Sequence, residues 1–426
     1  MSDQAVDRPA HARQILKRVA VIGAGVVGLA CAARLQIRGY AVTLIDPRDP
    51  GSACSYGNAG CLSRASCVPL GLPGTWKKVP GWLLDPKGPL VIAPRYAPRI
   101  APWLWRFWRN TRIDRVNAIA DALHSLLDVT IEKWRPLAAW AGVPELIRQD
   151  GYAFAYESEG AFVADSLGRE LRRAHGVKLE ILTGGEIREF DRALSSTITH
   201  MVVMPEQGHV PNPLRLSQAL AARLREGGAR FERSAAEGFE FTDGKVARVR
   251  TASGAIDTDF VVVAAGARSK PLAAQLGAVV PLETERGYHL MLESPSVTPR
   301  IPVCSGEGKY FATAMEGGLR IAGTVELAGL DAAPNYARAD AMLDGAKRLM
   351  PSLQHGRVEK WMGHRPSLPD SKPVIGRAPA ARNALFAFGH GHVGLTAAAP
   401  TSELIADALE GKPGFASLEP FRADRF

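Results

Sequence analysis

The sequence predicts an α/β protein of two domains, one of Rossmann type and a second α+β domain built on a mixed sheet. The chain has 426 residues, which exceeds the ~250–300 residues at which a single hydrophobic core stops growing. Its first elements alternate strand, helix and strand, whereas residues 283–325 contain several strands in succession. Hydrophobic residues make up 46% and charged residues 22% of the chain, a balance that excludes a largely disordered protein.

The N-terminal elements follow from the spacing of apolar residues. Residues 1–17 are polar and mixed in charge, and they predict a flexible arm without a secretory signal. The run Arg18–Ile22 predicts a strand, which a helix from Val26 to about Arg38 and a second strand at Ala41–Ile45 follow. Residues 46–80 are rich in Gly, Ser and Pro and predict loops. The most apolar run, 19–33, is shorter than the ~20 residues of a spanning helix, so we expect no membrane crossing.

The remaining elements alternate in type along the chain. Residues 81–115 interleave aromatic and basic residues, a helical pattern continues to residue 140, and residues 150–205 mix short strands and helices. The turn signal Asp243-Gly244 predicts a small meander. The other predicted elements are a helix at 212–227, strands at 229–233 and 260–264, strands between 283 and 325, a helix at 339–349, a strand at 384–388 and a helix at 396–409.

The turn after the first strand carries the strongest motif. Gly23, Gly25 and Gly28 fit G-x-G-x-x-G between a strand and a helix, where glycines let the backbone approach a pyrophosphate. The helix N-terminus offers N–H groups and a partial positive charge to the phosphates. Asp46 ends the second strand, 18 residues after Gly28, where a carboxylate accepts a hydrogen bond from a ribose hydroxyl and repels a 2′-phosphate. The motif therefore predicts FAD or NAD and disfavours NADP.

A second glycine loop favours FAD over NAD. It contains Gly389, Gly391 and Gly394 and runs directly into a helix that begins near Thr396. A helix N-terminus suits the negative charge that a reduced flavin gathers at its N1–C2=O edge. The structural alternative is an ordinary glycine-loop entry to a packing helix.

Five blocks of the chain together resemble the D-amino-acid oxidase superfamily of FAD enzymes, and within it the bacterial D-amino-acid dehydrogenases of the small-subunit type. The blocks are the glycine fingerprint, Ser55–Gly60, Val261–Gly266, Gly363–Gly376 and the C-terminal glycine loop, in matching order and spacing. The resemblance spans roughly residues 18–412. It implies a Rossmann-type FAD-binding domain formed by residues 18–80, 205–275 and 355–426, and a mixed-sheet substrate domain formed by residues 81–204 and 276–354.

The resemblance also implies which residues contact FAD. Small residues between positions 55 and 60 would lie beside the flavin ring and pyrophosphate, Gly266 near the same pyrophosphate, and the C-terminal loop at the pyrimidine edge. Bare turns of small residues are the structural alternative for all three segments. The predicted FAD-binding residues are Gly23, Ala24, Gly25, Val26, Val27, Gly28, Asp46, Ser55, Asn58, Ala59, Gly60, Gly266, Gly389, Gly391, Gly394, Leu395 and Thr396.

Four further residues are implied to act on the substrate. Arg365 is similar in position to the arginine that clamps the substrate carboxylate in this family, and a guanidinium fork suits that task; a structural salt bridge is the alternative. Tyr310 resembles the tyrosine that joins this clamp, or else it is a buried structural tyrosine. Tyr288 and His289 are candidates for lining the pocket, with a core or surface position as the alternative.

The activity implied by the resemblance is oxidative deamination of a D-amino acid. Hydride transfer from the α-carbon of the neutral amine to flavin N5 gives an imino acid, which hydrolyses to a 2-oxo acid and ammonia. Positioning carries much of the rate and the transfer itself requires no side-chain base. D-proline or a hydroxy-D-proline is a special substrate to test, and a quinone or another acceptor would take the electrons. The alternative is an oxygen-using oxidase of glycine, sarcosine or another secondary amine.

The charge pattern indicates anionic partners. The 52 basic and 43 acidic residues give a net charge of +9, and residues 102–109 interleave Trp and Phe with Arg. Trp prefers the membrane–water interface and Arg reaches anionic head groups. The segment therefore predicts a cytoplasmic protein held peripherally on the inner face of the membrane, or else a substrate-domain helix with its tryptophans in the core. No helix-turn-helix, RNA-binding aromatic motif or Lys/Arg run supports nucleic-acid binding.

The five cysteines predict neither a disulfide framework nor a metal site. Their number is odd, which indicates reduced thiols. Cys54, Cys61 and Cys67 cluster in the sequence without a C-x-x-C pair or a nearby histidine, so no metal is expected. The sequence predicts no particular oligomeric state.

Overall fold

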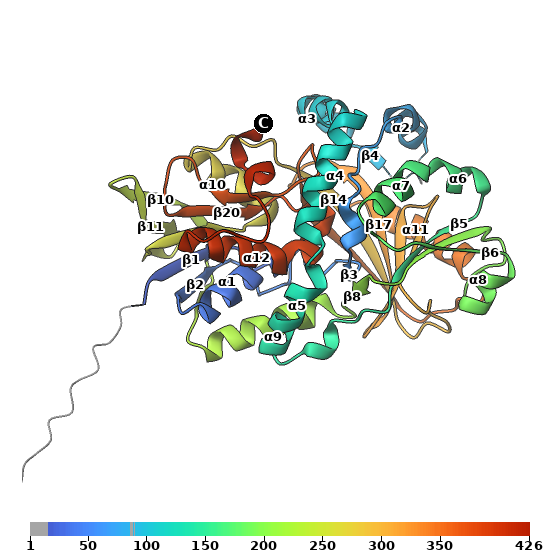
Figure 1. The fold of residues 1–426 in the computed structure, drawn as a ribbon, viewed down its shortest axis with the longest axis horizontal. Helices are drawn as coiled ribbons and strands as arrows, with labels where there is room; N and C mark the ends of the chain where they lie inside the picture. Colours follow the sequence, from blue (N-terminus) through green and yellow to red (C-terminus); the bar gives the residue numbers. More distant parts are fainter. Residues whose placement is uncertain (1–15, 86–87, 89) are drawn as a thin grey trace, which may run out of the picture.

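Two large sheets organise the molecule. The computed structural model describes residues 16–85, 88 and 90–426, so most of the predicted arm at residues 1–17 lies outside the described part. Figure 1 shows a six-stranded sheet on the left and a nine-stranded sheet on the right, with helices over both. None of the helices in the described part of the chain is both long and apolar enough to cross a membrane.

The six-stranded sheet has the order β19-β20-β13-β1-β2-β9. All neighbouring strands are parallel except β19, which runs antiparallel to β20. Val21 of β1 lies opposite Val262 on one side and Leu44 on the other, and all three are buried. Such continuous apolar runs are typical of parallel strands that are covered on both faces. The strands are β1 (Arg18–Ile22), β2 (Ala41–Ile45), β9 (Arg230–Glu232), β13 (Phe260–Val263), β19 (Val374–Arg377) and β20 (Ala384–Phe388).

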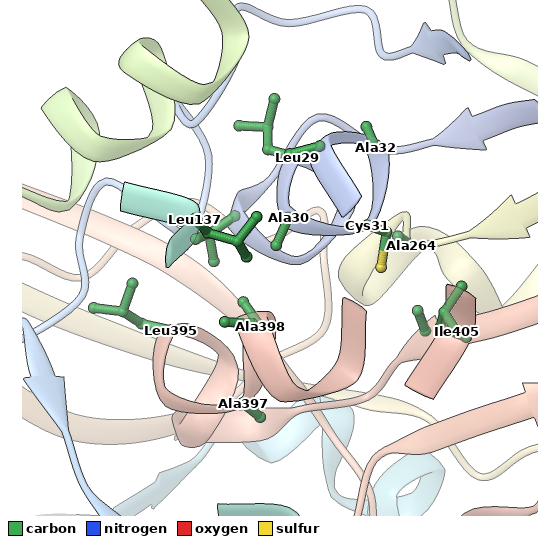
Figure 2. Packing of buried hydrophobic residues seen from close by; sticks show 14 of the residues in the cluster. Leu29, Ala30, Cys31, Ala32, Leu137, Ala264, Leu395, Ala397, Ala398 and Ile405 are labelled. Atoms are coloured by element: carbon green, nitrogen blue, oxygen red, sulfur yellow. The ribbon is translucent and has the colours of Figure 1, made fainter. Parts of the chain in front are cut away.

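One face of this sheet is covered by α1 (Val26–Ile37), α9 (Pro213–Glu226) and α12 (Gly394–Glu410), which share one buried core. Figure 2 shows Ala30 of α1 directed toward Ala398 of α12, with Leu137 beside them. Small side chains let the two helices approach closely. At the far end of the pair, Arg38 bonds Glu403 at 2.7 Å, which joins the two helices from the solvent side.

The opposite face is covered by a small antiparallel sheet and a short helix. The sheet contains β10 (Ala236–Thr242), β11 (Lys245–Thr251) and β12 (Gly254–Asp257), and α10 (Ser269–Gln275) lies beside it. The predicted meander around Asp243 is confirmed, because β10 and β11 pair across this turn. Asp243 has a φ of 49°, a left-handed conformation that Asp tolerates in such turns.

The nine-stranded sheet has the order β18-β14-β17-β16-β15-β5-β7-β6, and β4 pairs with β17 beside this path. Most pairings are antiparallel, whereas β15 with β5 and β17 with β4 are parallel. The sheet is therefore mixed, as predicted. Its strands are β4 (Leu90–Ile92), β5 (Tyr152–Tyr156), β6 (Glu180–Thr183), β7 (His200–Met204), β14 (Glu283–Leu292), β15 (Val303–Ser305), β16 (Tyr310–Met315), β17 (Gly318–Leu327) and β18 (Val358–Ser367).

Helices cover the nine-stranded sheet and link it to the other sheet. α11 (Ala337–Leu349) packs on β14 and β17, and α2 (Thr75–Leu84) and α3 (Ala97–Arg109) lie near β4 at the upper edge in Figure 1. The predicted loop at residues 46–80 thus includes the start of α2. The remaining elements are α4 (Ile113–Leu127), α5 (Thr130–Trp140), α6 (Glu159–Ala164), α7 (Ser166–Ala174), α8 (Gly185–Phe190), and the two-stranded pair β3 (Cys61–Leu62) with β8 (Gly208–His209).

Two of the predicted domain ranges contribute to both sheets. Within 81–204, α4 and α5 pack against α12 because their apolar stripe, including Leu123 and Trp134, joins the core of the six-stranded sheet. The indole N–H of Trp134 donates to the carbonyl of Leu395 at 2.9 Å. Within 355–426, β18 pairs with β14 in the nine-stranded sheet. The chain therefore crosses repeatedly between the sheets, and its crossings meet at one cavity.

Candidate active site

A cavity of ≈ 1070 Å³ lies where the two sheets meet. One wall consists of the segments that follow the carboxyl ends of β1, β2, β13 and β20, which is where ligands bind in open α/β sheets. The other wall is a face of β14, β17 and β18. The cavity is elongated. Asp46 lines it at one end, and Trp361 and α3 line parts of it that lie away from Asp46.

The glycine fingerprint forms a turn that leaves no room for a side chain at Gly23 or Gly28. Gly23 has a φ of 109°, and a Cβ there would lie 2.3 Å from the carbonyl oxygen of Ala264. A Cβ on Gly28 would lie 1.9 Å from the carbonyl oxygen of Gly23. Gly25, Val26 and the first turn of α1 line the cavity, so the N-terminus of α1 faces the space that a pyrophosphate would occupy.

The Asp46 carboxylate is held by two backbone N–H groups. Oδ2 accepts from Ala24 and Oδ1 from Arg48, each at 2.9 Å. Each carboxylate oxygen retains a further lone pair, and Asp46 lines the cavity. The carboxylate is therefore oriented for a ribose hydroxyl. Ala24 itself does not line the cavity and contributes through this backbone bond.

The segment around Ser55–Gly60 is fixed by side chains from elsewhere. The Ser55 hydroxyl accepts a hydrogen bond from the N–H of Val26 at 2.9 Å, so it caps α1. Arg320 of β17 donates to the carbonyls of Tyr56 at 2.8 Å and Asn58 at 2.7 Å. Ser55, Asn58 and Ala59 line the cavity, whereas Gly60 lies behind it, where a Cβ would meet the carbonyl of Val210.

Arg320 positions the loop that lines the cavity, and the sequence did not predict this role. It is 3% exposed, and burial lowers the pKa of its guanidinium to about 10, so it remains charged at neutral pH. A charged group this deeply buried needs hydrogen-bond partners, which the two carbonyls supply. A lone arginine in the apolar strand Leu319–Ala322 is the signal that could have identified it.

The C-terminal glycine loop follows β20, so it lies in the same wall as the glycine fingerprint but at the end opposite to Asp46. Gly389 and Gly391 have φ values of 81° and 53°, and α12 begins at Gly394. Gly266 lines the same wall after β13. All five predicted loop residues line the cavity, namely Gly389, Gly391, Gly394, Leu395 and Thr396. A second helix N-terminus therefore faces the cavity, as the sequence predicts.

Two histidines of this loop are uncharged. His390 is 2% exposed, and burial lowers its pKa to about 3. Burial and the nearby Arg365 lower the pKa of His392 to about 4. Both imidazoles are therefore neutral at physiological pH, and the positive charge on this side of the cavity comes from arginine.

Arg365 lies flat on the strand face of the second wall. A Cβ on Gly287 would lie 2.2 Å from the guanidinium carbon, so only glycine leaves room for the side chain. Nη1 donates to the carbonyl of Thr324 at 2.8 Å and Nη2 to that of Gly323 at 3.3 Å. These bonds use two of its five N–H groups, and Arg365 lines the cavity.

A β-bulge presents those two carbonyls. Between Arg286 and Tyr288 of β14, the partner strand β17 contains one extra residue. Thr324 in this bulge has a φ of 59°, a conformation that costs a β-branched residue ~1–3 kcal/mol. The strained backbone turns its carbonyl toward Arg365, and the Thr324 hydroxyl is buried without a hydrogen-bond partner among the described residues.

The other predicted substrate residues occupy three different environments. Tyr288 lines the cavity, but its hydroxyl donates to Glu326 at 2.5 Å and accepts from the N–H of Asn335 at 2.9 Å. His289 lies behind Trp361, on which it stacks with ring centroids 5.0 Å apart. Burial lowers the pKa of His289 to about 3, so its imidazole is neutral.

The prediction that Tyr310 joins a carboxylate clamp is not supported by its position. Successive side chains of a strand point to opposite faces, and Phe311, the neighbour of Tyr310 on β16, lines the cavity. Tyr310 points the other way into the core beneath α11, where a Cβ on Gly345 would lie 2.7 Å from its ring. It is the buried structural tyrosine that the sequence left as its alternative.

Trp361 and Glu285 line the cavity and were not predicted. The Trp361 indole lies between Gly57 and Gly363, at each of which a Cβ would collide with it, at 1.7 and 2.0 Å. Glu285 is 5% exposed and stands directly opposite Arg365 in the β14–β18 register. Burial raises the pKa of Glu285, and the Arg365 charge opposes this rise. Both could have been predicted from the alternation of side chains along β14 and β18, which places Trp361 on the same face as Arg365, and Glu285 opposite Arg365.

The cysteines do not form a site of their own. All five are free thiols, and burial raises the pKa of each. Within residues 16–85, 88 and 90–426, no three His, Cys, Asp or Glu side chains are arranged to hold a metal ion.

Comparison with known proteins identifies similar chains. The sequence model of the FAD dependent oxidoreductases (DAO) matches residues 18–408. A D-amino-acid oxidase of Bradyrhizobium diazoefficiens is 44% identical, covering 96% of this chain and 99% of that protein. A D-amino acid dehydrogenase of Paramagnetospirillum magneticum is 29% identical over the same shares of both chains.

Solved structures share the fold at lower identity. The L-proline dehydrogenase from P. horikoshii superposes with a TM-score of 0.74 and 21% identity, covering 96% of this chain and 98% of that one. The glycine oxidase from Bacillus cereus gives a TM-score of 0.71 and 20% identity, covering 95% and 97%. These similarities confirm the fold class predicted from the sequence.

Asp46→Asn is expected to weaken FAD binding roughly tenfold, because it removes the charge from the hydrogen bond to the ribose hydroxyl while keeping the side chain's shape. Titration of the apoprotein with FAD, followed by quenching of flavin fluorescence, measures this. Asp49→Asn in the same loop is the matched control, since its side chain is 71% exposed and pairs with Arg233. An unchanged dissociation constant for Asp46→Asn would remove this residue from the cofactor site.

Proposed function

The chain belongs to the DAO family of FAD-dependent oxidoreductases, and we propose that it oxidises D-amino acids to imino acids, which hydrolyse to 2-oxo acids and ammonia. The observation that carries this proposal is the pair of opposite charges, Arg365 and Glu285, on one strand face of the cavity. An amino acid is a zwitterion, and such a pair complements both of its charges.

The residues present fit FAD. The turn at Gly23 and Gly28 has no room for side chains, Asp46 is oriented for a ribose, and two helix N-termini face the same elongated cavity. When bound, FAD supplies the two-electron acceptor for oxidation of the substrate C–N bond. The remaining chemistry falls to the chain's own residues, which bind and orient the substrate and exclude water.

Arg365 would hold the substrate carboxylate. Its guanidinium is fixed by the carbonyls of Gly323 and Thr324, so its orientation is set before substrate binds. Such preorganisation lowers the entropy lost when a carboxylate forms charge-assisted hydrogen bonds with the remaining N–H groups. A fixed carboxylate in turn fixes the direction of the α-carbon's hydrogen.

Glu285 would receive the substrate amino group. Residues directly opposite on antiparallel strands have Cβ atoms ~4.5–5.5 Å apart, and the Arg365 guanidinium extends over Gly287, two residues along the same face from Glu285. The Glu285 carboxylate and the Arg365 guanidinium therefore lie on the same face of the sheet and line the same cavity. An ionised Glu285 attracts the ammonium and offers an acceptor for the proton that leaves as the neutral amine forms.

A relative named D-amino-acid oxidase and several named D-amino acid dehydrogenases support a D-amino acid as the substrate class, and their names do not identify one electron acceptor for this chain. We favour a quinone or another acceptor over oxygen because the cavity has an apolar arm, formed partly by Leu90, Ile92 and Leu104. The second candidate is an oxygen-using oxidase of glycine, sarcosine or another secondary amine, which the fold shared with a glycine oxidase favours.

Anaerobic addition of D-amino acids, D-proline and a hydroxy-D-proline among them, is expected to bleach the flavin absorbance of the holoenzyme. The panel includes glycine and sarcosine, and each L-enantiomer serves as the control. Reoxidation by a soluble quinone in the absence of oxygen, with slow peroxide formation in air, supports the dehydrogenase. Bleaching by glycine or sarcosine alone would favour the second candidate, and no bleaching by any amino acid would contradict the proposal.

Arg365→Ala is expected to lower kcat/KM for D-amino acids roughly 100- to 1000-fold, mainly through KM, because the buried carboxylate loses its charged partner. Steady-state kinetics with an artificial acceptor measure this. Arg248→Ala, at a half-exposed position on β11, is the matched control and should retain full activity. A KM within twofold of the wild type would rule out the clamp.

Glu285→Gln is expected to raise KM for amino acids about tenfold and to change the pH profile. Burial raises the pKa of Glu285, and binding of the ammonium requires the ionised form. Wild-type kcat/KM therefore falls as the pH falls through this raised pKa, and the variant lacks that decline. Kinetics across a pH series measure both effects.

The control for Glu285→Gln is Glu283→Gln, which is two residues away on the same face but outside the cavity lining. A carboxylate ligand without an amino group should bind the Glu285→Gln variant at least as tightly as it binds the wild type, because the variant lacks the negative charge beside Arg365. If Glu285 served only to balance the Arg365 charge, amino acids would bind the variant more tightly as well. An unchanged pH profile for amino acids would also contradict the proposed role.

A further inference from the structure

Two helices and a short strand form a cap beside the cavity. The cap consists of α2, β4 and α3, and Figure 1 shows α2 and α3 near one another at the upper edge of the molecule. α3 is attached to the nine-stranded sheet through Ile100 and Trp103, which pack with Leu327 of β17. Trp103 also stacks on Phe107, with ring centroids 5.4 Å apart and planes inclined by 9°. The inner face of α3 is therefore an ordinary core contact.

The outer face of α3 carries tryptophans that no other described part of the chain covers fully. Trp105 is 58% exposed and Trp108 46% exposed, and their ring centroids lie 4.9 Å apart. On α2, Trp76 is 54% exposed. The sequence left open whether this segment's tryptophans lie in a core or on a surface. Trp103 is in the core, and Trp105 and Trp108 are on the surface.

The charges around these tryptophans are almost all positive. Residues 75–114 contain eight basic residues and two acidic ones, Asp85 and Asp114, and Asp114 pairs with Arg112 at 3.2 Å. Arg106 and Arg109 follow the exposed tryptophans on α3 and are themselves exposed. The exposed basic residues of the cap, including the turn between β4 and α3, are Lys77, Arg95, Arg99, Arg106 and Arg109.

The cavity opens at this cap. Trp76 and Trp108 are both half-exposed and both line the cavity, so its mouth lies between α2 and α3. The lining inside the mouth is apolar, with Val79, Leu104 and Phe107. Transfer of an apolar molecule into such an opening is favourable, whereas transfer of water or an ion from solvent is not.

We propose that the outer face of α2 and α3 docks on an anionic lipid bilayer, so that the cavity mouth faces the lipid. Tryptophan rings favour the membrane–water interface, and arginine stems lie on apolar surface while their guanidinium groups bind anionic head groups. A nucleic acid would use the positive charge but leave the clustered tryptophans and the apolar mouth without a role. Docking on lipid accounts for the positive charge, the exposed tryptophans and the apolar mouth. This inference goes beyond the proposed function because it does not depend on which amino acid is oxidised.

Co-sedimentation of the FAD-loaded protein with vesicles of phosphatidylglycerol and phosphatidylcholine tests the proposal. The wild type should sediment with anionic vesicles at low salt, weakly at high salt, and weakly with pure phosphatidylcholine. Trp105→Ala combined with Arg106→Glu and Arg109→Glu should lower the bound fraction at least tenfold. These three residues do not line the cavity, so activity with a soluble acceptor should be unchanged.

The matched control is Phe241→Ala combined with Lys245→Glu, which removes an exposed aromatic and a basic residue from the β10–β11 hairpin. It should bind vesicles as the wild type does. Equal sedimentation of the α3 variant and the wild type, or no sedimentation of the wild type, would overturn the proposal. Salt-sensitive binding to DNA or RNA without binding to vesicles would overturn it in favour of a nucleic acid.

Discussion

The buried guanidinium of Arg320 connects the two halves of the active site. It comes from β17 of the nine-stranded sheet and bonds the carbonyls of Tyr56 and Asn58, which belong to the loop after β2 of the six-stranded sheet. This loop supplies Ser55 to cap α1 and Gly57 to receive the Trp361 ring. Arg320 thereby ties the wall that follows β1, β2, β13 and β20 (the cofactor wall) to the wall formed by β14, β17 and β18 (the substrate wall). This connection fixes the width of the cavity between the two walls.

The substrate wall depends on local strain. The bulge at Thr324 turns two carbonyls toward Arg365, and Gly287 leaves the surface on which its guanidinium lies. Regular antiparallel pairing in place of the bulge, or a side chain at position 287, would displace the arginine. Glu285 on the same face then places a carboxyl group beside the positive Arg365, whereas the neutral His289, His390 and His392 add no charge.

Much of the cofactor wall was predictable because it depends on local sequence. β1, α1 and β2 follow from apolar spacing, and Gly23, Gly25 and Asp46 follow from a motif whose spacing is fixed by the pyrophosphate and the ribose. The substrate wall was less predictable because strand register decides which side chains face the cavity. Arg365 was found by resemblance, but Tyr310 points into the core, and Glu285, Arg320 and Trp361 become visible only once β14, β17 and β18 are paired.

The central claim is that Arg365 and Glu285 hold the two charged ends of an amino acid. A crystal structure of the FAD-loaded protein, reduced and soaked anaerobically with a D-amino acid, tests it most directly. We expect the ligand carboxylate on the Arg365 guanidinium and the ligand nitrogen within hydrogen-bond distance of Glu285. A carboxylate bound elsewhere, or a nitrogen directed away from Glu285, would contradict it.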